Sequence, residues 1–239
     1  MSPQDLMREK IIVALDMPEK EAALDMARSL KGHVPWVKIG MTLFYSEGPD
    51  IIREMRGLGF KVFVDLKMHD IPHQVSGACR VLVRAGADMF TVHASGGRAM
   101  LEAAVQETKS AASRFRVAPP GVIAVTVLTS LDDAGLAEIG IQRTSAEEVM
   151  TLGTLAWETG CDGVVCSPAE ATAIRGVFGE QGLVITPGVR PAWAEAGDQA
   201  RVATPAEAIA AGASHLVIGR PITQAPVPAE AVRRIVEGE

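Results

Sequence analysis

The chain has few of the residues and segments that would assign it to a specialised class of protein. Only three of its 239 residues are cysteine, and their spacing is neither that of a disulfide framework nor that of a metal site. No stretch approaches about 18 uninterrupted apolar residues, and the N-terminus lacks the basic region and apolar run of a secretory signal. We therefore expect a cytoplasmic protein without membrane association.

Positive charge is also scarce. The sequence has 23 lysines and arginines against 29 aspartates and glutamates, which gives a net charge of -6. This balance argues against nucleic acid as the main partner, because a nucleic-acid backbone is bound largely through an excess of positive charge. Basic side chains can still gather at one place, so the expected ionic partner is a small anion.

Apolar residues are plentiful, at 48% of the chain, which suits one large core and a single domain over residues 1–239. Short β-type runs alternate with amphipathic segments. The predicted strands are Ile11–Leu15, Trp36–Ile39, Lys61–Val64, Met89–Val92, Val122–Val127, Gly163–Cys166, Leu183–Ile185 and His215–Ile218. The predicted helices are Glu19–Leu30, Asp50–Leu58, Val75–Ala85, Arg98–Ser113, Ala146–Thr159, Ala169–Phe178, Ala206–Ala211 and Glu230–Val236.

The alternation of these elements predicts an α/β fold with a parallel sheet. Continuously apolar strands are typical of a sheet that helices cover on the outside, and eight such units in this length predict a closed (β/α)8 TIM barrel. A doubly wound sheet is the alternative.

The run DLKMHDIP at residues 65–72 is the most informative motif of the chain. Side chains two apart on a strand share a face, so Asp65 and Lys67 are expected to point the same way, and Asp70 to mark the turn that follows. Such a cluster could be a solvated group of ion pairs. The polar residues at the other strand ends favour a reaction centre instead.

In a TIM barrel the catalytic groups lie at the carboxyl ends of the strands. Two aspartates and two lysines aimed at one opening would be costly unless they paired with each other and with a ligand. We therefore predict a functional site there. The polar residues at or near the predicted strand ends are Asp16, Lys38, Asp65, Lys67, His93, Thr126, Thr129, Arg190 and Arg220.

The ends of the last two strands predict a phosphate site. The sequences PGVRP at 187–191 and VIGRP at 217–221 each place a glycine next to or near an arginine. Glycine lets a backbone N–H approach an anion closely, and arginine matches phosphate oxygens with two donors. Gln199, in the loop after Arg190, could add a donor when that loop folds over the ligand. Turn glycines with surface arginines are the alternative interpretation.

Together these motifs resemble those of the orotidine 5'-phosphate decarboxylase family, in order and over nearly the whole chain. The resemblance implies a homodimeric (β/α)8 barrel that needs no cofactor or metal and converts orotidine 5'-phosphate to UMP and carbon dioxide in pyrimidine synthesis. The matching segments are ALD at 14–16, VKIG at 37–40, DLKMHDIP at 65–72, VTVLTS at 125–130, PGVR at 187–190 and IGR at 218–220.

The resemblance also implies a role for each matching residue. Asp65 and Lys67 would act at the reacting carbon, and Asp70 with Ile71 would enter the site of the partner subunit. The remaining positions would be Asp16 and Lys38 at the ribose, with Lys38 also ordering the charge network, Thr129 at the pyrimidine, and Arg190, Gln199, Gly219 and Arg220 at the phosphate.

Two positions depart from the common form of the motif, since Met68 stands where an aromatic residue is frequent and His73 where asparagine is frequent. Three other functions remain open. A related Mg²⁺-dependent decarboxylase of keto-sugar phosphates shares the D-x-K-x-x-D pattern. A metal-dependent sugar-phosphate epimerase would want paired histidine and aspartate ligands at several strand ends, and a non-catalytic phosphate-binding protein would not need Lys67.

Overall fold

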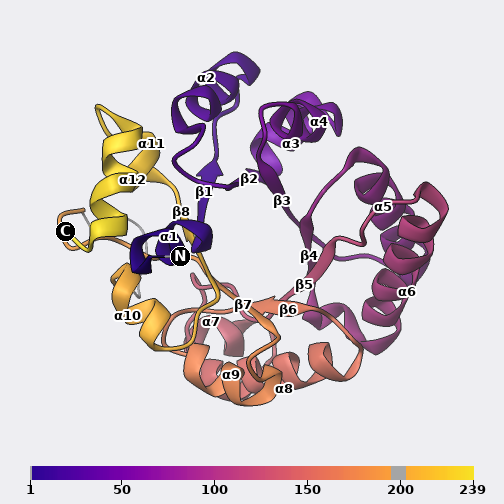
Figure 1. Cartoon of the computed structure of the whole chain (residues 1–239). Coiled ribbons are helices and arrows are strands. Elements are labelled where there is room, and N and C mark those ends of the chain that lie inside the picture. Colours follow the sequence, from indigo (N-terminus) through magenta and orange to yellow (C-terminus); the bar gives the residue numbers. More distant parts are fainter. Residues whose placement is uncertain (1, 195–202) are drawn as a thin grey trace.

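The structure is a computed structural model that describes residues 2–194 and 203–239. Eight parallel strands close into a barrel in which each strand pairs with its neighbours in sequence and β8 returns to β1 (Figure 1). The TIM-barrel prediction is confirmed, and the doubly wound alternative is wrong. The strands are β1 (Ile11–Leu15), β2 (Trp36–Gly40), β3 (Lys61–Met68), β4 (Met89–His93), β5 (Gly121–Val125), β6 (Gly163–Val165), β7 (Leu183–Thr186) and β8 (His215–Ile218).

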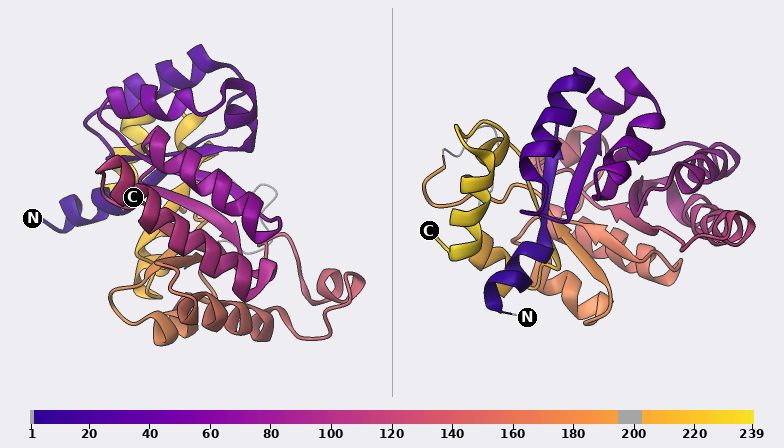
Figure 2. Two further views of the ribbon diagram at one scale, coloured as in Figure 1. Left: turned by 90° about the vertical axis from the view of Figure 1, so that its right-hand side faces the viewer. Right: turned by 45° about the horizontal axis from the view of Figure 1, so that its top comes forward.

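Helices surround the barrel on the outside, and α5 and α6 lie side by side there (Figures 1 and 2). None of the helices in the described ranges is both long and apolar enough to cross a membrane. The helices are α1 (Pro3–Lys10), α2 (Lys20–Leu30), α3 (Met41–Glu47), α4 (Asp50–Gly57), α5 (Pro72–Ala85), α6 (Gly97–Phe115), α7 (Asp133–Glu138), α8 (Ser145–Glu158), α9 (Ala171–Phe178), α10 (Pro205–Ala210), α11 (Arg220–Thr223) and α12 (Pro228–Glu237), with a 3-10 turn at Ala94–Gly96.

The helix that follows the DLKMHDIP motif shows how local sequence sets an element. α5 begins at Pro72, whose fixed φ and missing N–H suit the first helical position. It ends before Gly86, which adopts a left-handed φ of +93° that a side chain would disfavour. The motif therefore runs from the end of β3 into the start of α5, and proline fixes that start.

Alternation along the strands divides their side chains between two apolar layers. One set, such as Ile11, Val13 and Leu15 of β1, packs outward against the helices. The other set faces the barrel interior and forms a separate cluster near the amino ends of the strands. We call this cluster the barrel plug, and its buried members are Ile12, Trp36, Phe63, Met89, Ile123 and Ile185.

The third strand differs most from its prediction. The apolar run predicted a strand over Lys61–Val64, whereas β3 continues through the charged residues to Met68. Its pairing with β4 shifts register between Val64 and Met68, and Lys67 adopts a left-handed φ of +52°. The other strands agree with their predictions to within two residues at each end. The irregularity of β3 thus falls in the segment that carries the charges.

Candidate active site

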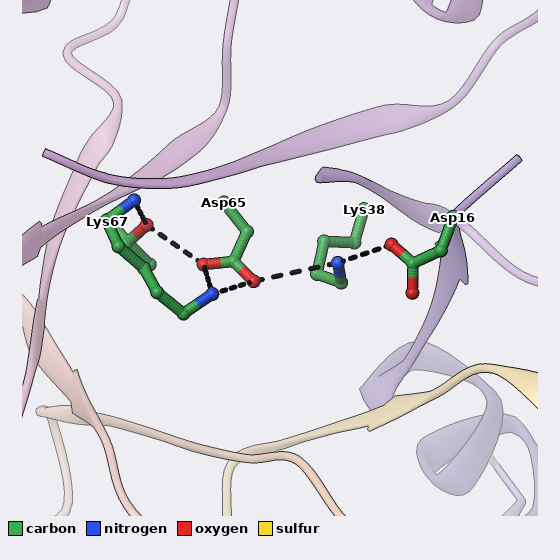
Figure 3. Close-up of polar contacts among 5 residues, drawn as sticks. Asp16, Lys38, Asp65 and Lys67 are labelled. Carbon is green, nitrogen blue, oxygen red and sulfur yellow. Dashed lines mark hydrogen bonds and ion pairs between the residues drawn. The ribbon is translucent and has the colours of Figure 1, made fainter. Parts of the chain in front are cut away.

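Four charged side chains form a continuous row across β1, β2 and β3 at the carboxyl ends of these strands (Figure 3). The Nζ of Lys38 lies 3.0 Å from Oδ1 of Asp16 and 3.6 Å from Oδ2 of Asp65. The Nζ of Lys67 lies 2.9 Å from each carboxylate oxygen of Asp65. Because the signs alternate, every charge in the row is next to an opposite one.

Asp65 is the centre of this network. Its side chain is only 14% exposed, and the hydroxyl of Thr91 donates a 3.0 Å hydrogen bond to its Oδ1. Burial by itself would raise the pKa of Asp65, but the charges of Lys38 and Lys67, with the hydrogen bonds from Lys67 and Thr91, outweigh burial and lower it. Asp65 is therefore held as a carboxylate beside two ammonium groups.

The backbone of Lys67 explains how its side chain reaches Asp65. A left-handed φ is uncommon for a residue with a side chain, and here the Lys67 N–H donates a 2.8 Å hydrogen bond to the hydroxyl of Thr91. The predicted proximity of Asp65 and Lys67 is confirmed. Regular strand alternation, from which we predicted it, is the wrong reason, because the strand is irregular at this point.

A cavity of about 290 Å³ opens at the carboxyl ends of the strands, where ligand sites of such barrels lie. Eight of the residues singled out from the sequence line it, and apolar side chains such as Phe63, Val125 and Val165 form much of the remaining wall. The eight are Asp16, Lys38, Asp65, Lys67, Thr129, Arg190, Gly219 and Arg220.

The β7 and β8 side of the cavity carries the two arginines. Arg190 is buried and Arg220 is exposed. Burial lowers the pKa of Arg190, and the nearby positive charge of Arg220 lowers it further. Two arginines close enough to repel each other create a positive potential that favours an anion between them. Gly188, with a φ of +74°, makes the turn between β7 and Arg190.

Other predicted residues lie outside the cavity of this chain. Asp70 and Ile71 are exposed, and Oδ1 of Asp70 accepts a 2.6 Å hydrogen bond from the Ile71 N–H. His93 is half-buried with its ring centroid 5.5 Å from that of His69, and burial, then the charges of His69 and Lys67, lower its pKa. Gln199 lies outside the described residues.

Two residues that the structure brings into the site had no assigned part in the sequence interpretation. Thr91 links Asp65 to the Lys67 backbone, and its position two residues before His93 on β4 was a usable signal, since alternation places both on one face. Gly40 lies two residues after Lys38 on β2, so alternation places these two residues on one face as well. By contrast, the buried hydroxyl of Thr126 donates to the carbonyl of Val165, a contact within the sheet.

The donor set of the described residues is poor in metal ligands. Among residues 2–194 and 203–239, histidine, cysteine, aspartate and glutamate side chains nowhere form a group of three that could hold a metal ion. These residues therefore do not form the multi-ligand metal site that the epimerase hypothesis requires. The three cysteines, Cys79, Cys161 and Cys166, are all buried and free.

The fold and this site define a class: a (β/α)8 barrel whose carboxyl-end cavity joins a Lys–Asp charge row to an arginine-rich anion side. A family model described as "Orotidine 5'-phosphate decarboxylase / HUMPS family" matches residues 9–235, and the chain belongs to this family.

Proteins named orotidine 5'-phosphate decarboxylase are similar to this chain over nearly its whole length. The protein from Paramagnetospirillum magneticum is 49% identical over 96% of this chain and 97% of its own length, and that from Moorella thermoacetica is 50% identical over 95% and 91%. The crystal structure of orotidine 5'-phosphate decarboxylase from Lactobacillus acidophilus superposes with a TM-score of 0.85 at 38% identity, covering 96% of this chain and 98% of that one.

Proposed function

We propose that this enzyme decarboxylates orotidine 5'-phosphate to UMP and carbon dioxide, the step that forms UMP in pyrimidine synthesis. Relatives that carry this name align with nearly the entire chain. The observation that carries the chemical argument is the Lys67 ammonium, held 2.9 Å from both oxygens of Asp65 on the wall of the cavity. A fixed cation beside a reacting carbon is what loss of carbon dioxide from a pyrimidine ring requires.

Lys67 acts as both electrostatic stabiliser and proton donor in this proposal. When the bond between the ring carbon and the carboxylate breaks, its electron pair stays on the ring carbon in the ring plane, where the carbonyls delocalise it poorly. The Lys67 ammonium stabilises that charge and then transfers one proton to the carbon. The resulting amine regains its proton from water, so the enzyme is restored. Arginine could not replace lysine, because it does not release a proton.

Asp65 has two parts in the same step. It orients the Lys67 ammonium through the paired contacts described above. It also stands where it would repel the substrate carboxylate, by about 4 kcal/mol at about 4 Å and an effective dielectric of about 20. That repulsion disappears as neutral carbon dioxide leaves, so it favours bond breaking. Lys38 holds Asp65 from the other side.

The remaining site residues bind the parts of the nucleotide that do not react. We assign the phosphate to Arg190, Gly219 and Arg220 because their side of the cavity carries like positive charges. Binding energy from a remote phosphate can hold the ring against the charge row. The other assignments follow the family resemblance: Asp16 and Lys38 at the ribose, Thr129 at the pyrimidine and Gln199 at the phosphate.

We further propose a homodimer in which Asp70 and Ile71 complete the site of the partner. Ile71 is 63% exposed, and an exposed large apolar side chain beside the charged Asp70 suits a subunit contact. A mixture of Lys67→Ala and Asp70→Ala subunits tests this. Each variant alone should be inactive, whereas mixed dimers contain one intact site, so about a quarter of the wild-type activity should return. No recovery after subunit exchange would contradict the shared site.

Three further assignments complete the proposal. Residues 1–239 act as one domain, the reaction uses no cofactor or metal, and the protein works in the reducing cytoplasm. The last assignment is supported by the three buried free thiols, whose pKa values burial raises, to about 12 for Cys79 and about 11 for Cys161. The metal assignment is supported by the Lys67 ammonium, which supplies the positive charge that the reaction needs.

The direct test is an absorbance assay of orotidine 5'-phosphate loss, run with and without a metal chelator. We expect the same turnover in both, with UMP as product. Absence of turnover would contradict the proposed substrate. Turnover that the chelator abolishes would instead contradict the assignment of a reaction without a metal.

A further inference from the structure

Gly40 lies beside the Asp16–Lys38 ion pair at the edge of the site. It is buried, it ends β2, and it lies two residues after Lys38, so both face the barrel interior. Its partner in the neighbouring strand is Asp65. Its backbone is extended, with φ -87° and ψ -179°, a conformation that any residue adopts. The backbone therefore does not explain why this position is glycine.

The space around Gly40 does explain it. A Cβ at this position would lie 2.8 Å from Oδ1 of Asp16 and 3.1 Å from Nζ of Lys38. These are the two atoms that form the 3.0 Å ion pair between those residues. A methyl group would therefore clash with the atoms that form this hydrogen bond. The Asp16 side chain is 60% exposed, so it has room to turn toward solvent, and such a turn would take its carboxylate out of the row.

Other glycines of the chain show that this close approach is local. At Gly57 in α4 and Gly176 in α9, an added Cβ would meet no atom within 4 Å. Neither residue has a positive φ. An alanine at either position should therefore be accepted without movement of its neighbours, and alanine favours a helix more than glycine does.

Loss of the contact with Asp16 would change the balance of charges around Asp65. Lys38 now lies between two carboxylates, 3.0 Å from Asp16 and 3.6 Å from Asp65. If Asp16 turned away, Lys38 would move toward Asp65 and compete with Lys67 for the same carboxylate. The effect of a methyl group at Gly40 would thus reach the lysine that we place at the reacting carbon.

We propose that Gly40 is a positioning residue: its missing side chain makes room for the Asp16–Lys38 ion pair and thereby keeps Lys67 paired with Asp65. This inference rests on the proposed decarboxylase function. It does not place Gly40 in contact with the substrate, and it predicts that the cost of a side chain at this position depends on Asp16.

The test is a double-mutant cycle of Gly40→Ala and Asp16→Ala, with Gly57→Ala as the matched glycine control. The readouts are kcat and KM for orotidine 5'-phosphate, the dissociation constant of UMP, and the melting temperature. We expect Gly40→Ala to lower kcat/KM by about 100-fold, the scale of a misplacement of about 1 Å in an active site. Gly57→Ala should match the wild type.

The decisive comparison is between Asp16→Ala and the double variant. If the methyl group acts by displacing Asp16, Gly40→Ala should have little further effect once Asp16 is shortened. A double variant that folds when Gly40→Ala alone does not would support the same conclusion. Full activity of Gly40→Ala, equal losses in both backgrounds, or failure of both variants to fold would overturn the inference. An inactive wild type would instead overturn the proposed function.

Discussion

The two ends of this barrel are built from the same strands and have opposite characters. At the amino ends, the barrel plug fills the interior with Ile12, Trp36, Phe63 and other apolar side chains. At the carboxyl ends, the interior opens into a cavity lined by lysines, aspartates and arginines. β3 contributes Phe63 to the plug and Asp65 to the charge row, two residues apart.

The apolar end of the barrel supports the charged end. The plug consists of apolar side chains packed against each other, so it contributes stability mainly through burial. The charge row instead consists of groups whose burial is costly and is offset by pairing. If the two ends have separate tasks, substitutions at one end should change turnover with little loss of stability, and those at the other end should do the reverse.

The largest expected effect is that of Lys67→Ala. Loss of a general acid costs about 10²–10⁴ in rate, and loss of the electrostatic contribution adds about 10²–10³. We therefore expect kcat to fall by at least about 10⁴, measured by UMP formation, while the protein still binds UMP. Lys61→Ala is the control, because Lys61 lies at the opposite end of the same strand, over the Trp36 ring. Substantial turnover by Lys67→Ala would show that Lys67 is not the proton donor.

The second expected effect is on stability, from Ile123→Ala in the plug. Ile123 is fully buried, and removal of such a side chain costs about 2–5 kcal/mol. Denaturant unfolding should show this loss, whereas kcat per folded molecule should stay near the wild-type value. Val117→Ala, at a position that is 47% exposed, should change stability little. A large fall in kcat for folded Ile123→Ala would show that the plug also shapes the site.

A pH effect is expected from His215, at the amino end of β8 and in edge contact with Trp36. Burial, with the charges of Lys10 and Lys61, lowers the pKa of His215 to about 4 from its ordinary 6.5. Between pH 6.5 and about pH 4, His215 therefore binds a proton in the unfolded chain but not in the folded protein. Stability should fall as the pH drops from 6.5 toward 4, by about 2 kcal/mol between pH 7 and pH 5.

The matched variant for this prediction is His215→Phe, which keeps a ring against Trp36 and removes the titrating group. The loss of unfolding free energy between pH 7 and pH 5 should be about 2 kcal/mol larger for the wild type than for His215→Phe. Parallel pH profiles would show that His215 does not contribute.

The smallest effect is expected from Arg220→Ala on the anion side. A hydrogen bond to a charged group contributes about 1.5–3 kcal/mol, which corresponds to about 10- to 150-fold in kcat/KM. The loss should appear with orotidine 5'-phosphate and be absent with orotidine, which lacks the phosphate. Arg53→Ala, in an exposed ion pair of α4, is the control. An equal loss with both substrates would place Arg220 outside the phosphate site.

The sequence predicted most of the fold because the strands are continuously apolar and short. β1 and β8 have the predicted bounds. The short helices α1, α3 and α7 were missed because they span only six to eight residues, too few for an apolar period to repeat, and bury at most one residue each. The extension of β3 was missed because charged residues interrupt its apolar pattern.

The residues that line the cavity were largely predictable, because all strands of a parallel barrel end on the same side. Asp16, Lys38 and Lys67 reach one cavity for this reason. The left-handed backbone of Lys67 and the space at Gly40 could not be predicted, since they depend on how neighbouring strands approach each other. Local propensity carries no information about such contacts.

A crystal structure of this protein with UMP bound would show directly whether Lys67 lies at the reacting carbon. We expect the Lys67 ammonium in contact with the ring carbon that loses the carboxylate, at about 3–3.5 Å, with the phosphate between Arg190 and Arg220. A nucleotide bound elsewhere, or a Lys67 side chain turned away from the ring, would contradict this expectation.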